Sequence, residues 1–151
     1  MTVLVGINRS DDSRAAIRLA AQEARYRNAP LIAIMAYPAE RAWSPAVRPG
    51  VSRLAPTDDR AVAEALLREA VSDALGDGAN GVQYQAVAGV PGRALVNAAL
   101  RANAQLIVLA TRHGVARALG AVSQYVLLNA SCPVLVVPQA STSDDGDRGK
   151  K

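Results

Sequence analysis

The sequence has no phenylalanine, one cysteine and one histidine among its 151 residues. The single cysteine, Cys132, excludes an internal disulfide and a cysteine-based metal cluster, and we expect it to be buried rather than reactive. The single histidine, His113, excludes a metal site built from several histidines. Without phenylalanine, the core has to consist of Val, Leu, Ile and Ala, and such small side chains suit helices packed closely on a sheet.

Lysine is almost absent as well, so the net charge of +4 comes from arginine. The arginines are dispersed along the chain and alternate with acidic residues. Nucleic-acid binding requires clustered positive charge that displaces counterions from phosphates, and we therefore expect no nucleic-acid partner. The sequence also lacks a signal peptide and an apolar run of membrane length, which predicts a soluble, cytoplasmic protein with no membrane partner.

Five short apolar runs alternate with segments of helical periodicity. The runs predict strands at 2–7, 31–37, 82–88, 105–110 and 134–137. Helices are expected after Asp11 and Asp12, after Thr57, after the turn at 89–93 and over 120–129. Uniformly apolar strands separated by helices are typical of a parallel sheet that is covered on both faces. The predicted fold is an α/β three-layer sandwich with a five-stranded parallel sheet and about four helices.

Three segments stand outside these elements. Residues 38–56 are rich in Pro and Arg and are expected to form a long mobile loop. In the turn at 89–93, we expect Pro91 to fix the backbone conformation and Gly92 to relieve the backbone strain of the turn. Residues 141–151 contain no apolar side chain and are expected to form a disordered tail, which leaves residues 1–140 as one domain.

Candidate binding residues follow the first and fourth predicted strands, because ligands of open parallel sheets bind at the carboxyl ends of strands where the strand order reverses. The last helix also begins there, and its free N–H groups and positive dipole end suit a phosphate. These residues are Asn8, Ser10, Arg112, His113, Gly114, Gly120, Ala121, Val122 and Ser123.

Four segments in this order resemble the universal stress protein family. They are VLVGINRSDDS at 3–13, AGVPGRALVNAA at 88–99, LIVLATRHG at 106–114 and GAVSQYVLLNASCPVLVVP at 120–138. The resemblance implies a regulatory protein of the stress response rather than an enzyme. Many members bind ATP through a loop Gly-x2-Gly-x9-Gly-[Ser/Thr] after the fourth strand. By the same resemblance, adenine is expected near Ile7 and Tyr37.

The loop of this chain departs from the family pattern. Ala110 and His113 stand at the first two glycine positions, six residues instead of nine precede Gly120, and Ala121 replaces the hydroxyl residue. The lost hydroxyl costs about 1 kcal/mol, whereas the shorter loop removes N–H groups that would wrap the β- and γ-phosphates. Asn8 replaces an acid and brings no charge to a metal ion. These changes predict weak binding of ATP or AMP, with a single phosphate at the helix start and no metal.

Two functions remain open from the sequence. The first is a stress-response regulator that binds an adenine nucleotide weakly. The second is a dimeric protein-interaction module that binds no nucleotide. In both, the last strand is expected to pair with its copy in a homodimer, because an apolar edge strand needs protection. The residues of that strand are Val134, Leu135, Val136 and Val137. No carboxylate is placed beside His113, and no catalytic group is predicted.

Overall fold

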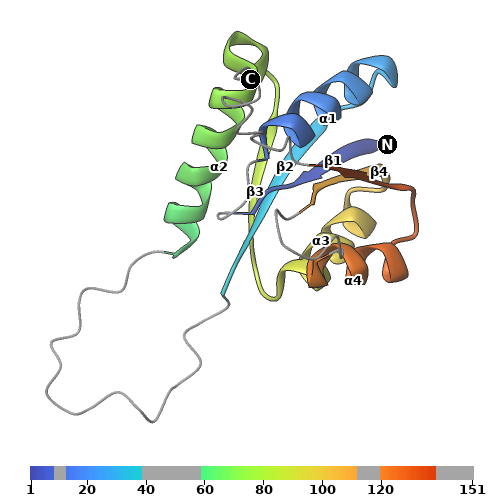
Figure 1. Ribbon diagram of the computed structural model, residues 1–151. Coiled ribbons are helices and arrows are strands. Elements are labelled where there is room, and N and C mark those ends of the chain that lie inside the picture. The colour runs from blue at the N-terminus through green and yellow to red at the C-terminus, as the bar shows by residue number, and fades with distance from the viewer. Residues whose placement is uncertain (9–12, 39–58, 112–119, 139–151) are drawn as a thin grey trace, which may run out of the picture.

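The computed structural model describes residues 1–8, 13–38, 59–111 and 120–138 of the chain (Figure 1). Strands and helices alternate along it. They are β1 (Thr2–Gly6), α1 (Arg14–Tyr26), β2 (Leu31–Tyr37), α2 (Asp59–Leu75), the short 3-10 helix η1 (Gly76–Ala79), β3 (Gln83–Ala88), α3 (Pro91–Arg101), β4 (Ala104–Ala110), α4 (Ala121–Asn129) and β5 (Val134–Val137). The predicted elements agree with these bounds to within one or two residues where both ends are described.

The strands form one parallel sheet in the order β3-β2-β1-β4-β5. The chain builds β1, β2 and β3 outward in one direction and then returns to add β4 and β5 on the other side of β1. Helices α1 and α2 cover one face, and α3 and α4 cover the other (Figure 1). The predicted three-layer α/β fold is thus confirmed, and β3 lies at a sheet edge as its alternating pattern indicated.

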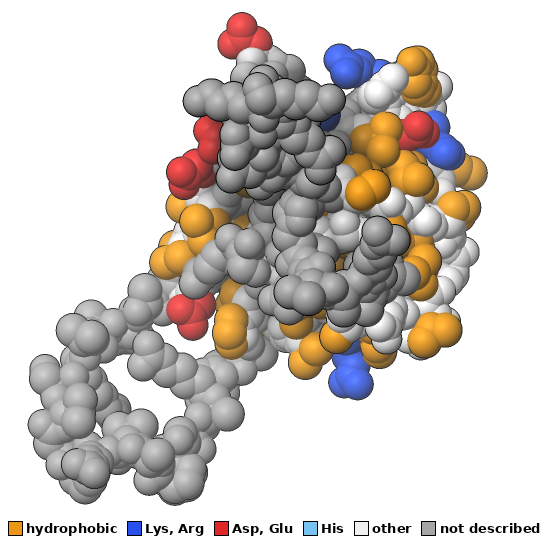
Figure 2. Space-filling view, in the orientation of Figure 1, with side chains coloured by type: hydrophobic (Ala, Val, Ile, Leu, Met, Phe, Trp, Pro, Cys, Tyr) orange, Lys and Arg blue, Asp and Glu red, His pale blue; other side chains and the backbone are white. Residues whose placement is uncertain are grey.

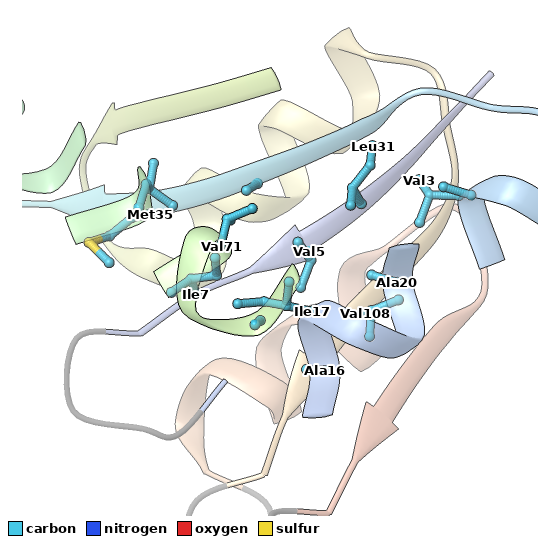
Figure 3. Close-up of a cluster of buried hydrophobic side chains, with 14 of the residues drawn as sticks. Val3, Val5, Ile7, Ala16, Ile17, Ala20, Leu31, Met35, Val71 and Val108 are labelled. Carbon is cyan, nitrogen blue, oxygen red and sulfur yellow. The ribbon is translucent and has the colours of Figure 1, made fainter. Parts of the chain in front are cut away.

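Strand β1 is buried on both faces, and its side chains alternate between two cores. Val3 and Val5 belong to the cluster under α1 and α2, where Figure 3 shows Val5 beside Ile17. Leu4 belongs to the cluster under α3 and α4. Gly6 ends the strand, and a Cβ at this position would lie 2.7 Å from Leu109 Cδ2 of β4 and 3.0 Å from Leu95 Cδ1 of α3. The sheet therefore meets α3 closely at the point where β1 ends.

Helix α1 packs through a stripe of small residues. Ala16, Ile17, Ala20 and Ala24 are its buried positions, and their spacing repeats every three to four residues. Alanine methyl groups allow the helix axis to approach the sheet closely. The predicted cap residues Asp11 and Asp12, and Thr57 before α2, lie outside the described residues. The residue that precedes α1 is Ser13, whose side chain makes no capping hydrogen bond.

The prediction for Gly92 was wrong. Helix α3 already begins at Pro91, a position where the missing N–H costs no hydrogen bond. Gly92 is the second helical residue, and a Cβ there would lie 3.0 Å from the ring of Tyr125 in α4. The turn instead depends on Gly89, whose φ of +132° is available to glycine but strained for other residues. Gly92 serves the close packing of α3 on α4.

The predicted loop at 38–56, apart from Pro38, and the predicted tail at 141–151 lie outside the described residues. In the described part of the chain, no helix combines the length and apolar character that crossing a membrane requires.

Candidate functional site

A cavity of about 530 Å³ opens at the carboxyl ends of β1, β2 and β4. This is the point where the strand order reverses between β1 and β4, and it is the position at which open parallel sheets bind ligands. Its volume lies within the range of small-molecule sites. The described lining residues are Gly6, Ile7, Asn8, Ser13, Met35, Ala36, Tyr37, Pro38, Asp59, Ala63, Pro91, Leu95, Leu109, Ala110, Gly120, Ala121, Val122 and Ser123.

Hydrogen bonds between strand ends hold the rim of this cavity in place. The Ile7 amide donates to the Ile34 carbonyl at 2.8 Å, which ties the end of β1 to β2. The Gly89 amide donates to the Tyr37 carbonyl at 2.8 Å, and the Thr111 amide donates to the Val137 carbonyl at 2.8 Å. Each of these strand ends is thereby fixed to its neighbour at the rim of the cavity.

The amino end of α4 forms one wall of the cavity. Gly120 is the N-cap, and it has no side chain with which to cap the helix. The first hydrogen bond of the helix runs from the Gln124 amide to the Gly120 carbonyl at 3.0 Å. The N–H groups of Ala121 to Ser123 therefore have no carbonyl partner within the helix. These groups and the helix dipole favour an anion at this wall.

The opposite part of the cavity is largely apolar. Ile7 and Met35 extend from the ends of β1 and β2, and Figure 3 shows them next to each other on the α1 and α2 side of the sheet. Tyr37 and Pro38 continue this surface from β2. A planar apolar group such as a nucleobase can be buried here, while a polar or anionic group reaches α4.

The structure brings together seven of the predicted site residues. Ile7, Asn8, Tyr37, Gly120, Ala121, Val122 and Ser123 all line the cavity. Ser10, Arg112, His113 and Gly114 lie outside the described residues. The binding role of all eleven residues stays a prediction, since their position alone does not identify a ligand.

Sequence reasoning missed several lining residues, of which Ser13 and Asp59 are polar. Asp59 comes from the first turn of α2 and carries the only charge among the described lining residues. No local pattern places it near β1, because the segment before it lies outside any predicted element. Ser13 directly precedes α1 and borders the cavity.

Cys132 lies outside this cavity and packs against the core under α3 and α4. Its burial raises the pKa of the thiol, because a thiolate is less well solvated there. Cys132 is half-buried rather than fully buried as predicted, and this environment disfavours the reactive thiolate. Among the described residues, no group of three or more His, Cys, Asp or Glu side chains is arranged to hold a metal ion.

Figure 2 shows acidic and basic side chains scattered over the described surface among hydrophobic ones, with a red and a blue side chain side by side at the upper right. Two ion pairs are described. Arg27 pairs with Glu23 next to α1, and Arg60 pairs with Glu64 within α2; both pairs are at the surface. Such pairs contribute little to stability.

Comparison with known proteins places this geometry in a family. The family model described as the universal stress protein family matches residues 1–138. A comparison with curated proteins gave no match. Among solved structures, a universal stress protein in complex with cAMP is 28% identical, with a TM-score of 0.65 over 91% of this chain and 96% of that one.

Two further structures have the same fold. The protein Rv1636 of Mycobacterium tuberculosis is 31% identical, with a TM-score of 0.55 over 90% of this chain and 93% of that one. A universal stress protein of Archaeoglobus fulgidus in complex with dAMP is 21% identical, with a TM-score of 0.59 over 91% and 97%, and it supports the fold alone. On the family match over residues 1–138, this chain belongs to the universal stress protein family.

Proposed function

We propose that this protein is a regulatory member of its family that binds an adenine nucleotide with a single phosphate in the cavity between the ends of β1 and β4. The observation that carries the proposal is the uncapped start of α4 facing a cavity whose other part is apolar. The relative in complex with cAMP, at 28% identity and nearly full coverage, supports an adenine mononucleotide as the ligand class.

A single phosphate suits the cavity better than a chain of phosphates. Of the helices that begin at the cavity, α4 offers free N–H groups in its first turn, whereas α3 begins with Pro91, which has no N–H, and α2 begins with the carboxylate of Asp59. The described lining contains no lysine or arginine, and it contains the carboxylate of Asp59. Each additional phosphate would add negative charge, and the described lining offers no cationic side chain to bind it. ATP should therefore bind more weakly than AMP or cAMP.

The same lining supports a binding function without catalysis. The described lining residues include no histidine, cysteine or lysine, and Asp59 is the only carboxylic acid among them. A hydrolytic or transfer reaction needs an activated nucleophile with an adjacent base, together with groups that stabilise developing charge. We therefore propose that nucleotide occupancy, rather than turnover, is what this protein contributes to a stress response.

Calorimetry with AMP, cAMP and ATP tests the proposed ligand class. We expect saturable binding of AMP or cAMP, weaker binding of ATP, and no requirement for Mg²⁺. Ser123→Ala should weaken AMP binding by roughly fivefold if its hydroxyl, at the start of α4, contributes one hydrogen bond of about 1 kcal/mol. Absence of heat and of fluorescent-nucleotide displacement at millimolar ligand would contradict the proposal.

We also propose that two copies of the chain pair through β5. This strand is the outermost strand of the sheet on its side, and all four of its residues remain half-exposed. Leu127 and Leu128 of α4 add exposed apolar surface, with Leu128 84% exposed. An uncovered apolar edge is stabilised when a second strand pairs with it. A dimeric interaction module without nucleotide remains the second candidate function, and this edge is the observation that favours it.

Sedimentation equilibrium at tens of micromolar tests the dimer. The expected mass is twice the chain mass of 15.7 kDa. Val136→Lys should raise the dimer dissociation constant at least about tenfold, because a charge at a strand edge opposes edge-to-edge pairing. Val90→Lys is the matched control, since Val90 is 68% exposed and lies in the turn before α3. A wild-type monomer, or equal effects of both variants, would refute the pairing through β5.

A further inference from the structure

Ser13 is the one described residue whose buried side-chain oxygen has no hydrogen-bond partner. The residue directly precedes α1 and is only 5% exposed. Its φ of −91° and ψ of 2° differ from the extended geometry of a capping residue, and its hydroxyl caps no helical amide. Its backbone carbonyl, in contrast, accepts from the Ile17 amide at 2.8 Å. Helix α1 therefore uses the backbone of Ser13 but not its hydroxyl.

The position of Ser13 is shared by two cavities. The cavity at the ends of β1, β2 and β4 is one of them. A second cavity of about 440 Å³ lies between α1 and α2, and its described lining also includes Arg14, Glu69 and Asp73. Four residues line both cavities, namely Ile7, Asn8, Ser13 and Met35. We refer to these four shared residues as the neck, and a ligand that reaches them from the first cavity comes to lie next to Ser13.

A buried hydroxyl without a partner disfavours the folded state, because the group loses its hydrogen bonds to water and gains none in return. An alanine at this position would avoid that cost without removing any described contact of the helix cap. The described sheet and helices supply no partner, and Ser13 lines a cavity that is open to a ligand. A ligand with a hydroxyl group at the neck would supply that partner.

We infer that the Ser13 hydroxyl is a ligand-binding group that hydrogen-bonds a sugar hydroxyl of the bound nucleotide and thereby selects ribose over deoxyribose. The inference rests on the proposed function. A nucleotide with its base against Met35 and Tyr37 and its phosphate at α4 places the sugar between these two ends, beside the neck. A site that hydrogen-bonds a ligand hydroxyl discriminates against the analogue that lacks it, because the protein group is then left unpaired.

The test measures the affinity of wild type, Ser13→Ala and Ser72→Ala for AMP, 2′-deoxy-AMP and 3′-deoxy-AMP. Ser72 is an exposed serine of α2 outside both described cavity linings and serves as the control. We expect Ser13→Ala to bind AMP about tenfold more weakly, as for one buried hydrogen bond. One deoxy analogue should lose the same factor with wild type and bind Ser13→Ala as well as AMP does. The unfolding temperature of ligand-free Ser13→Ala should equal or exceed that of wild type.

Each other outcome has a separate meaning. If wild type binds AMP and Ser13→Ala binds it equally well, the inference is wrong while the proposed function stands. If ligand-free Ser13→Ala melts several degrees lower and both deoxy analogues bind like AMP, Ser13 is a structural residue and the inference is again wrong. If wild type binds none of the three nucleotides, the proposed function fails, and the inference fails with it.

Discussion

Ala121→Glu is expected to weaken AMP or cAMP binding by about 30-fold while leaving the protein folded. Ala121 is the first residue of α4, is exposed, and lines the cavity at the wall proposed to hold the phosphate. Two like charges about 4 Å apart repel by about 4 kcal/mol at the dielectric of a partly exposed site. Half of that energy, after screening by solvent, corresponds to roughly 30-fold in affinity.

The matched control is Ala121→Gln, which has the same size as the glutamate variant but no charge. A carboxylate in the first turn of a helix stabilises the helix by about 0.3–1 kcal/mol, so Ala121→Glu should melt no lower than Ala121→Gln. Calorimetry and thermal unfolding of both variants give the comparison. Equal affinities of the two variants would show that the phosphate does not lie at α4, even if a nucleotide binds elsewhere.

Leu67→Ala is expected to lower the free energy of unfolding by about 2–5 kcal/mol, which corresponds to a fall of roughly 5–15 °C in the unfolding temperature. Leu67 is fully buried and attaches α2 to the core under α1 and α2. Without phenylalanine, it is among the largest fully buried side chains of this protein. Many of its cluster neighbours are alanines, and their single methyl groups cannot move far enough to fill the space left behind.

Leu100→Ala provides the comparison for Leu67→Ala. Leu100 lies on α3, is 58% exposed and forms part of neither described core cluster. Its replacement should change the free energy of unfolding by less than about 1 kcal/mol, as most surface substitutions do. Urea unfolding of both variants measures the difference. A loss below 1 kcal/mol for Leu67→Ala would mean that α2 contributes little to the stability of the sheet's first face.

The strands were predictable because their burial is uniform. All five residues of β1 are buried, so the sequence shows an unbroken apolar run rather than an alternating one. β3 is an edge strand, and its polar positions 83 and 85 alternate with apolar ones in the sequence for the same reason. Helix α1 was predictable from its alanine stripe. In each case the spacing of apolar residues in the sequence matches the spacing at which side chains of a strand or a helix return to the same face.

The details of the site were less predictable. Both Gly89 and Gly92 belong to the GVPGR segment, and only the φ of Gly89 and the proximity of Gly92 to Tyr125 separate a turn glycine from a packing glycine. Asp59 reaches the cavity because α2 packs beside α1, a contact between elements that no local spacing encodes. The position of a side chain at the start of a helix depends on how the whole helix docks.

The sequence alone determined the order of strands and helices along the chain and the parallel sheet, because these follow from periodicity within short segments. The tertiary structure decided which residues share the cavity, and it showed that the Ser13 hydroxyl has no described partner. Whether a polar atom finds a partner depends on groups far apart in the chain. Only their packing in three dimensions brings Asn8, Ser13, Asp59 and Gly120 to the same cavity.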